Sequence, residues 1–166
     1  MRRKYSTANP SSQEVINHFR KAIEHNPQNA AAYDQLSRSL SCCNDASLRD
    51  PQAALEAARK NMELLPNKQD HPYGLATLGI AQYSAGLYAE AIDTWQRVEK
   101  AAKADGKPHA PFQLFLAMCH WQLGDKSEAQ AWYTLARGGY KKAVFNTFFA
   151  EAESMMGPLG EAEQLD

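Results

Sequence analysis

Few residues in this chain could do chemistry, and the most suggestive are the neighbours Cys119 and His120. A thiol beside an imidazole is the pairing that activates a cysteine nucleophile. Both residues fall in a stretch with helical apolar spacing, however, and neighbours on a helix point about 100° apart, so the two side chains do not face each other. Cys119 also lies on the apolar stripe. The sequence therefore favours a buried structural cysteine over a catalytic one.

The remaining candidate groups do not form a recognisable site either. The five histidines lack metal-ligand spacing, and neither Cys-x-x-Cys nor His-Glu-x-x-His occurs. These histidines are His18, His25, His71, His109 and His120. The nearest acid–base candidates are Glu24 beside His25, and Glu90 with Glu128, whose positions in the first turns of predicted helices suit the helix dipole. No glycine-rich phosphate loop follows a strand. We expect no enzyme, no metal and no cofactor.

Composition narrows the possible partners and compartments. Eighteen Lys and Arg residues balance nineteen Asp and Glu, and the net charge of -1 gives no field that attracts nucleic acid or a membrane surface. Two of the three cysteines, Cys42 and Cys43, are adjacent and cannot easily bridge each other, so a disulfide framework is not expected. No apolar run has membrane-spanning length, and no apolar core follows the basic start. We expect a cytoplasmic protein.

Capping and breaking residues predict a chain made of helices. Ser11 with Glu14 has capping-box spacing, Asp50-Pro51 suits a helix start, and Gly124 suits a helix end. No segment alternates with period two, so no strand is predicted. The predicted helices cover roughly 11–25, 30–43, 51–65, 72–85, 88–104, 112–123, 126–136 and 141–156. Residues 1–10 are expected to be a disordered lead-in, 11–157 one domain, and 158–166 a loose acidic tail.

The helices repeat. A shift of 38 positions lays Gly86 on Gly124, Ala91 on Ala129 and Trp95 on Tyr133. A small residue lets two helices approach closely, and an aromatic residue four positions later fills the space between them. Because one helix pair cannot bury its apolar face alone, the repetition predicts stacked pairs.

With these residues in view, the chain resembles the tetratricopeptide repeat family, whose repeat is about 34 residues in two antiparallel helices. One repeat matches at Leu78, Gly79, Tyr83, Gly86, Tyr88, Ala91, Trp95 and Val98, the next at Leu116, Ala117, Trp121, Gly124, Ala129, Tyr133 and Ala136, and another at Tyr33, Leu36, Ala54, Ala58 and Pro66. A half-repeat precedes them at Val15, Phe19, Ala22 and Pro27. The resemblance implies an all-α, right-handed superhelix of antiparallel helix pairs: an α-solenoid of about three repeats with an N-terminal half-repeat and a C-terminal capping helix.

The segment from Leu116 to Tyr133 also looks like the tetratricopeptide segments of some large bacterial signalling proteins. Two explanations of the half-repeat stay open. It is either the place where a longer array was cut or an N-terminal cap.

The same resemblance implies a concave face, lined by the first helix of each pair, that binds extended or helical peptides. The face would be lined by Asp34, Arg38, Ser41, Tyr73, Ala76, Thr77, Ile80, Tyr83, Leu114, Met118, Trp121 and Gln122. Such an apolar and aromatic surface indicates a partner. Tighter packing that buries Ile80 and Met118 in the core is the alternative.

We therefore expect a protein–protein interaction scaffold that binds a peptide or helix in this groove. The alternative is a self-associating or accessory module of a larger signalling protein, with its groove filled in cis. Phe145, Phe148, Phe149 and Met155 give the last predicted helix two apolar sides, more than one cap requires, so a homo-oligomer is possible on this pattern.

Overall fold

The computed structural model describes residues 11–43, 45–66, 71–105, 112–139 and 146–157. The elements are α1 (Ser12–His25), α2 (Ala30–Cys42), η1 (Ala46–Leu48), α3 (Pro51–Leu64), α4 (Pro72–Ser84), α5 (Tyr88–Asp105), α6 (Phe112–Gln122), α7 (Lys126–Gly139) and α8 (Asn146–Met156). None of the described residues forms a strand, and the all-α prediction is confirmed. The predicted lead-in, the predicted tail and the first residues of the predicted last helix lie outside these ranges.

The helix ends follow the local chemistry of the sequence. Ser11 and Glu14 form the predicted capping box, in which each side chain accepts a hydrogen bond from the other's backbone N–H. Asp50 accepts from the Ala53 backbone N–H at 3.0 Å, directly before Pro51 in the first turn of α3. Gly124 ends the turn after α6 with φ of 88°, a conformation that glycine adopts without strain.

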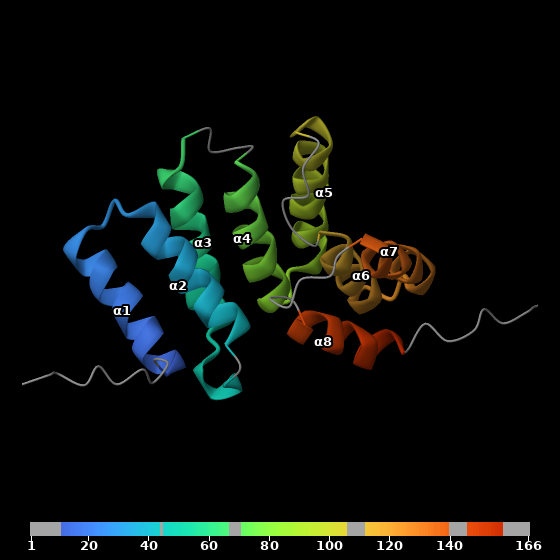
Figure 1. Cartoon of the computed structure of the whole chain (residues 1–166), viewed down its shortest axis with the longest axis horizontal. Helices are drawn as coiled ribbons and strands as arrows, with labels where there is room; N and C mark the ends of the chain where they lie inside the picture. Colours follow the sequence, from blue (N-terminus) through green and yellow to red (C-terminus); the bar gives the residue numbers. More distant parts are fainter. Residues whose placement is uncertain (1–10, 44, 67–70, 106–111, 140–145, 158–166) are drawn as a thin grey trace, which may run out of the picture.

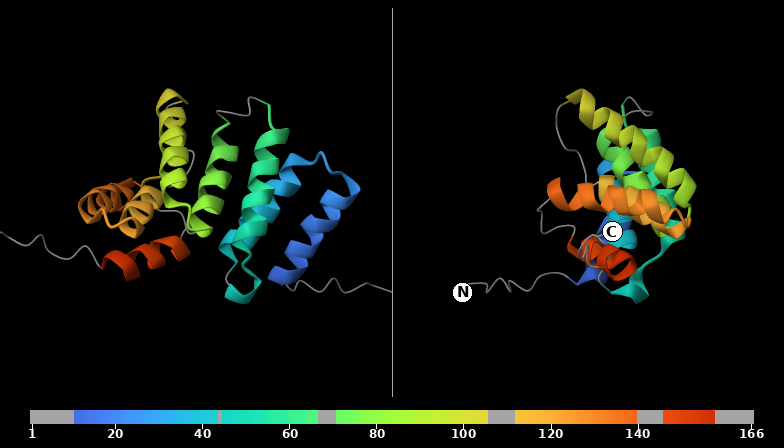
Figure 2. Two further views of the ribbon diagram at one scale, coloured as in Figure 1. Left: turned by 180° about the vertical axis from the view of Figure 1, so that it is seen from behind. Right: turned by 90° about the vertical axis from the view of Figure 1, so that its right-hand side faces the viewer.

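Consecutive helices pack against one another along the chain. Figure 1 shows α1 to α5 side by side in a row, with α6 and α7 turned so that they are seen nearly end-on. Helix α8 departs from this order. It lies below the row in Figure 1 and runs crosswise to α4, beside α6 and the end of α4 that carries Tyr83 (Figures 1 and 2).

The larger core joins α4, α5, α6, α7 and α8 around Trp95. The indole of Trp95 stacks on Phe115 with ring centroids 4.7 Å apart, and Phe115 meets Phe148 of α8 at 4.8 Å. A methyl group on Gly79 would lie 2.6 Å from the Trp95 ring, so this ring packs directly on the backbone of α4. The absence of a side chain at Gly79 therefore has a steric reason.

A second core joins α1, α2, α3 and α4, and it includes Ile16, Leu36, Leu40 and Ala58. Helix α4 contributes residues to both cores. Asn61 of α3 is buried in this region and donates from its side-chain amide to the Ala30 carbonyl at 2.8 Å. That bond ties the end of α3 to the start of α2.

Candidate functional site

The predicted groove residues divide into a buried set and an accessible set. Seven of the twelve are buried: the polar Ser41 and Thr77, and the apolar Ala76, Ile80, Tyr83, Leu114 and Met118, which pack in the core. The expectation that they form an open apolar surface is therefore corrected, and for Ile80 and Met118 the alternative of core packing holds. Asp34, Arg38 and Trp121 are half-buried, and Tyr73 and Gln122 are exposed.

The apolar groove residues are buried because the two helices that carry them, α4 and α6, are packed on several sides. All residues of α6 from Leu114 to Cys119 are buried, and α4 is buried on almost every side. A helix that is apolar all round is packed by neighbours on several faces, whereas a one-sided stripe describes a helix at the surface. The run Phe112–Cys119 carries this signal in the sequence, because Gln113 is its sole polar residue.

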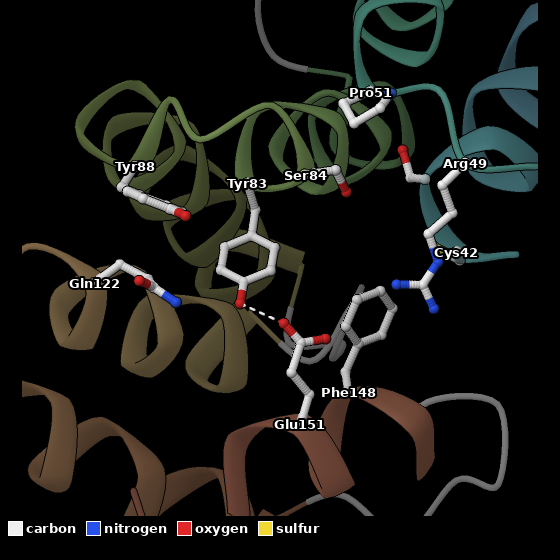
Figure 3. A pocket seen from close by; sticks show the side chains of 10 residues that line it. Cys42, Arg49, Pro51, Tyr83, Ser84, Tyr88, Gln122, Phe148 and Glu151 are labelled. Atoms are coloured by element: carbon white, nitrogen blue, oxygen red, sulfur yellow. Dashed lines mark hydrogen bonds between the residues drawn. The ribbon is translucent and has the colours of Figure 1, made fainter. Parts of the chain in front are cut away.

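Helix α8 covers part of the face on which a partner was predicted to bind. The Tyr83 hydroxyl donates to Glu151 Oε1 of α8 at 2.7 Å (Figure 3). Burial, followed by the hydrogen bond and charge of Glu151, raises the pKa of Tyr83 well above its ordinary value. Further along α8, the Gln122 amide lies 3.2 Å from Met155 Sδ, and Gln130 donates to the Met156 carbonyl at 3.3 Å. No local signal announced these long-range contacts.

One pocket lies at the edge of α8 and has a volume of about 320 Å³. The residues that line it come from helices α2 to α6, from α8 and from the segment before α3: Ser41, Cys42, Arg49, Pro51, Tyr83, Ser84, Tyr88, Gln122, Phe148 and Glu151 (Figure 3). Burial raises the pKa of the Cys42 thiol to about 11; the nearby Arg38 and Arg49 oppose this shift and Glu151 adds to it. The thiol is therefore protonated at neutral pH.

A second and larger pocket lies between α2 and α4 and measures about 500 Å³. It is lined by Ala30, Ala31, Asp34, Gln35, Arg38, Asn61, Leu65, His71, Tyr73, Gly74 and Thr77. Four of the predicted groove residues, Asp34, Arg38, Tyr73 and Thr77, thus come together here. Sequence reasoning missed Asn61 and His71, which reach this pocket from the end of α3 and the turn before α4.

Hydrogen bonds fix the polar wall of this α2–α4 groove. The Thr77 hydroxyl donates to Asp34 Oδ1, which links α4 to α2, and Arg38 Nε lies 4.0 Å from the same oxygen. The Arg38–Asp34 pair is therefore an ion pair whose atoms are too far apart for a hydrogen bond. Tyr73, with 64% of its surface exposed, stands at the rim. The groove thus combines a hydrogen-bonded polar wall with an accessible aromatic ring.

Trp121 and Gln122, the last predicted groove residues, lie at the end of α6 away from this groove. The Lys126 ammonium sits 3.5 Å from the Trp121 ring centroid, a cation–π contact that covers part of the indole. The structure therefore does not gather the twelve predicted residues into one surface.

The cysteine that first suggested chemistry lies in the core, as its place on the apolar stripe predicts. Burial raises the pKa of the Cys119 thiol to about 12, so the thiolate is scarcely populated near neutrality. His120 Nδ1 lies 3.5 Å from Asp125 of the following turn. Among the described residues, no group of three His, Cys, Asp or Glu side chains could hold a metal ion.

None of the described helices combines the length and the apolar character needed to cross a bilayer. No protein-family model matches the chain, and no curated protein is significantly similar to it.

Proposed function

We propose that the chain is a tetratricopeptide-like helical-repeat protein, a right-handed superhelix of helix pairs, that binds a peptide of a partner protein in the α2–α4 groove. The observation that carries the proposal is the groove itself, about 500 Å³ in volume, with Asp34, Arg38 and Tyr73 on its walls. Its size falls within the range of ligand-binding clefts. Consecutive packing of helix pairs and the 38-residue repetition support the assignment of the fold.

The role proposed is binding, with no catalytic step. The candidate nucleophile of the sequence, Cys119, is buried and protonated. The groove instead offers one carboxylate, one guanidinium and a phenol ring, which are groups that recognise a polypeptide. A cytoplasmic location accords with the unpaired cysteines among the described residues, and it forms part of the proposal.

The test is selection of ligands from a displayed library of random linear peptides, using the full chain as bait. Ala31 is exposed in the first turn of α2 and lines the groove, so Ala31→Trp would fill the groove without entering the core. Ala89, equally exposed in the first turn of α5, gives the matched control Ala89→Trp. We expect selected peptides to lose at least tenfold in affinity for Ala31→Trp and to bind Ala89→Trp normally. Equal affinity for both variants, or an unenriched library, would refute the proposal.

A second candidate function is an accessory or self-associating module whose groove is filled in cis by a segment of the same chain. The position of α8 favours this function. Glu151 bonds Tyr83, and Phe148 packs on Phe115, so α8 occupies part of the face where a partner helix would dock. Phe149 and Met155 are partly buried against the same core. Sedimentation at high concentration tests self-association. If Phe149→Asp leaves both folding and association unchanged, α8 does not join copies of the chain.

A further inference from the structure

The pocket beside α8 carries one positive and one negative side chain facing a shared space. It is separate from the α2–α4 groove, and its lining brings Arg49 and Glu151 together from distant parts of the sequence. Among the described residues that line it, these two alone are charged at neutral pH. Both charges act on the Cys42 thiol in the same pocket, with opposite effects on its pKa. The pocket is therefore neutral overall but strongly polarised.

Among the described residues, each charged group makes one hydrogen bond, which leaves its other polar atoms available. Arg49 donates from Nε to the Cys43 carbonyl at 2.7 Å, so its two terminal nitrogens remain for a ligand. Glu151 accepts a hydrogen bond from the Tyr83 hydroxyl through Oε1, so its second oxygen, Oε2, remains for a ligand. Figure 3 shows the guanidinium and the carboxylate on opposite sides of the Phe148 ring. No hydrogen bond or ion pair between described residues joins Arg49 to Glu151, so neither group neutralises the other directly.

The remaining walls are aromatic and small polar groups. Phe148 is buried and Tyr88 is half-buried, and both line the pocket. Ser41 Oγ, also in the lining, has no hydrogen-bond partner among the described residues. A volume of about 320 Å³ limits the ligand to a small molecule.

We propose that this pocket binds a free amino acid as a zwitterion. The carboxylate would pair with the Arg49 guanidinium, the ammonium with Glu151, and the hydrocarbon part would pack on Phe148 and Tyr88. A simple anion would meet the Glu151 charge and a simple cation the Arg49 charge, so a molecule that carries both charges is favoured over either.

Isothermal titration calorimetry of the full chain with the standard amino acids and with ω-amino acids of about four to six carbons tests this proposal. The two series differ in the separation of their charges and report the spacing that the pocket accepts. For the tightest ligand we expect its N-acetyl and its carboxamide derivatives each to bind at least tenfold more weakly, since each removes one charge-assisted contact. The proposal is overturned if no amino acid binds, or if either derivative binds as well as the zwitterion.

Two variants connect the affinity to the named groups. Glu151→Gln keeps an oxygen that accepts the hydrogen bond from Tyr83, so α8 keeps its position while the negative charge is lost. Arg49→Gln removes the positive charge. We expect each to bind the zwitterion at least tenfold more weakly, and Arg49→Lys to recover part of the loss. Arg59 is exposed on α3 outside the pocket, and Arg59→Gln is the matched control. An effect of either pocket variant no larger than that of Arg59→Gln would also overturn the proposal, and the peptide groove would be unaffected by that outcome.

Discussion

Replacing Gly79 by alanine tests whether the contact between α4 and α5 sets the spacing of the repeat. A Cβ at Gly79 would lie 2.6 Å from Trp95 Cε2 and 2.9 Å from Cζ2 and Nε1, and Trp95 is completely buried. The ring is rigid and enclosed, so the helices must move apart. Overpacking of this kind costs about 2–3 kcal/mol.

The same substitution removes a glycine from a helix interior, which by itself stabilises the folded state by about 1 kcal/mol. We therefore expect Gly79→Ala to lower the free energy of unfolding by about 1–2 kcal/mol. For a domain of this size the melting temperature would fall by about 2–8 °C. Thermal and urea unfolding followed by circular dichroism measure both quantities. Ala131→Gly, at an exposed position of α7, measures the helix-propensity effect alone with the opposite sign.

The repeat itself supplies a compensating change. At the equivalent positions 38 residues later the chain has Ala117 and Tyr133, a methyl group with a smaller ring. In Gly79→Ala combined with Trp95→Tyr we therefore expect the loss to be smaller than the sum of the single losses, with a coupling of at least about 1 kcal/mol. If Gly79→Ala stabilises the protein by as much as Ala131→Gly destabilises it, the steric explanation is wrong.

Three further predictions concern single groups. Tyr83→Phe, which removes the hydroxyl that donates to Glu151, should lower the free energy of unfolding by about 1.5–3 kcal/mol at pH 7. Because the pKa of Tyr83 is raised in the folded state, its contribution is complete below about pH 10 and falls above it, as the unfolded state loses the proton first. The difference between wild type and Tyr83→Phe in urea unfolding should therefore be constant up to about pH 10 and shrink above it. A difference that stays constant above that pH would contradict this assignment. Cys119, whose thiol pKa is raised to about 12 by burial, should resist alkylation by iodoacetamide at pH 8 until the chain is unfolded, as peptide mass spectrometry would show. Asp50→Ala, which removes the cap of α3, should cost about 1 kcal/mol in urea unfolding, whereas Asp50→Asn should cost little; equal losses would mean that the cap is not the cause.

Much of the fold could be predicted because its signals are local. Ser11 with Glu14, Asp50 with Pro51, and Gly124 act within one turn of the residues they affect. The 3-10 turn Ala46–Leu48 was not predicted; it lies between the predicted helices 30–43 and 51–65. Cys119 was predicted to be buried from helical spacing, and Ala129 and Tyr133 were predicted to pack between helices from the repetition; all three are buried.

The candidate site was harder to predict because exposure depends on what packs against a helix. Leu114 and Met118 were expected to line a groove because the resemblance implies that the first helix of each pair forms the concave face. The apolar run Phe112–Cys119 instead indicates a helix that is packed on several sides. Asn61, which lines the α2–α4 groove, donates a hydrogen bond to the Ala30 carbonyl. Glu151, which lines the pocket beside α8, accepts a hydrogen bond from Tyr83. Neither contact has a counterpart in the local pattern.

The sequence by itself determined the helices, their ends and the repetition that stacks them, because capping, glycine conformation and apolar periodicity act over a few residues. Only the tertiary structure decided which surfaces stay accessible. Tyr83 is buried beneath α8, whereas Tyr73 is exposed at the α2–α4 groove. Arg49 and Glu151, which are distant in the sequence, line the same pocket. The physical reason is that the accessibility of a side chain is set by neighbours distant in the chain, and no local pattern encodes them.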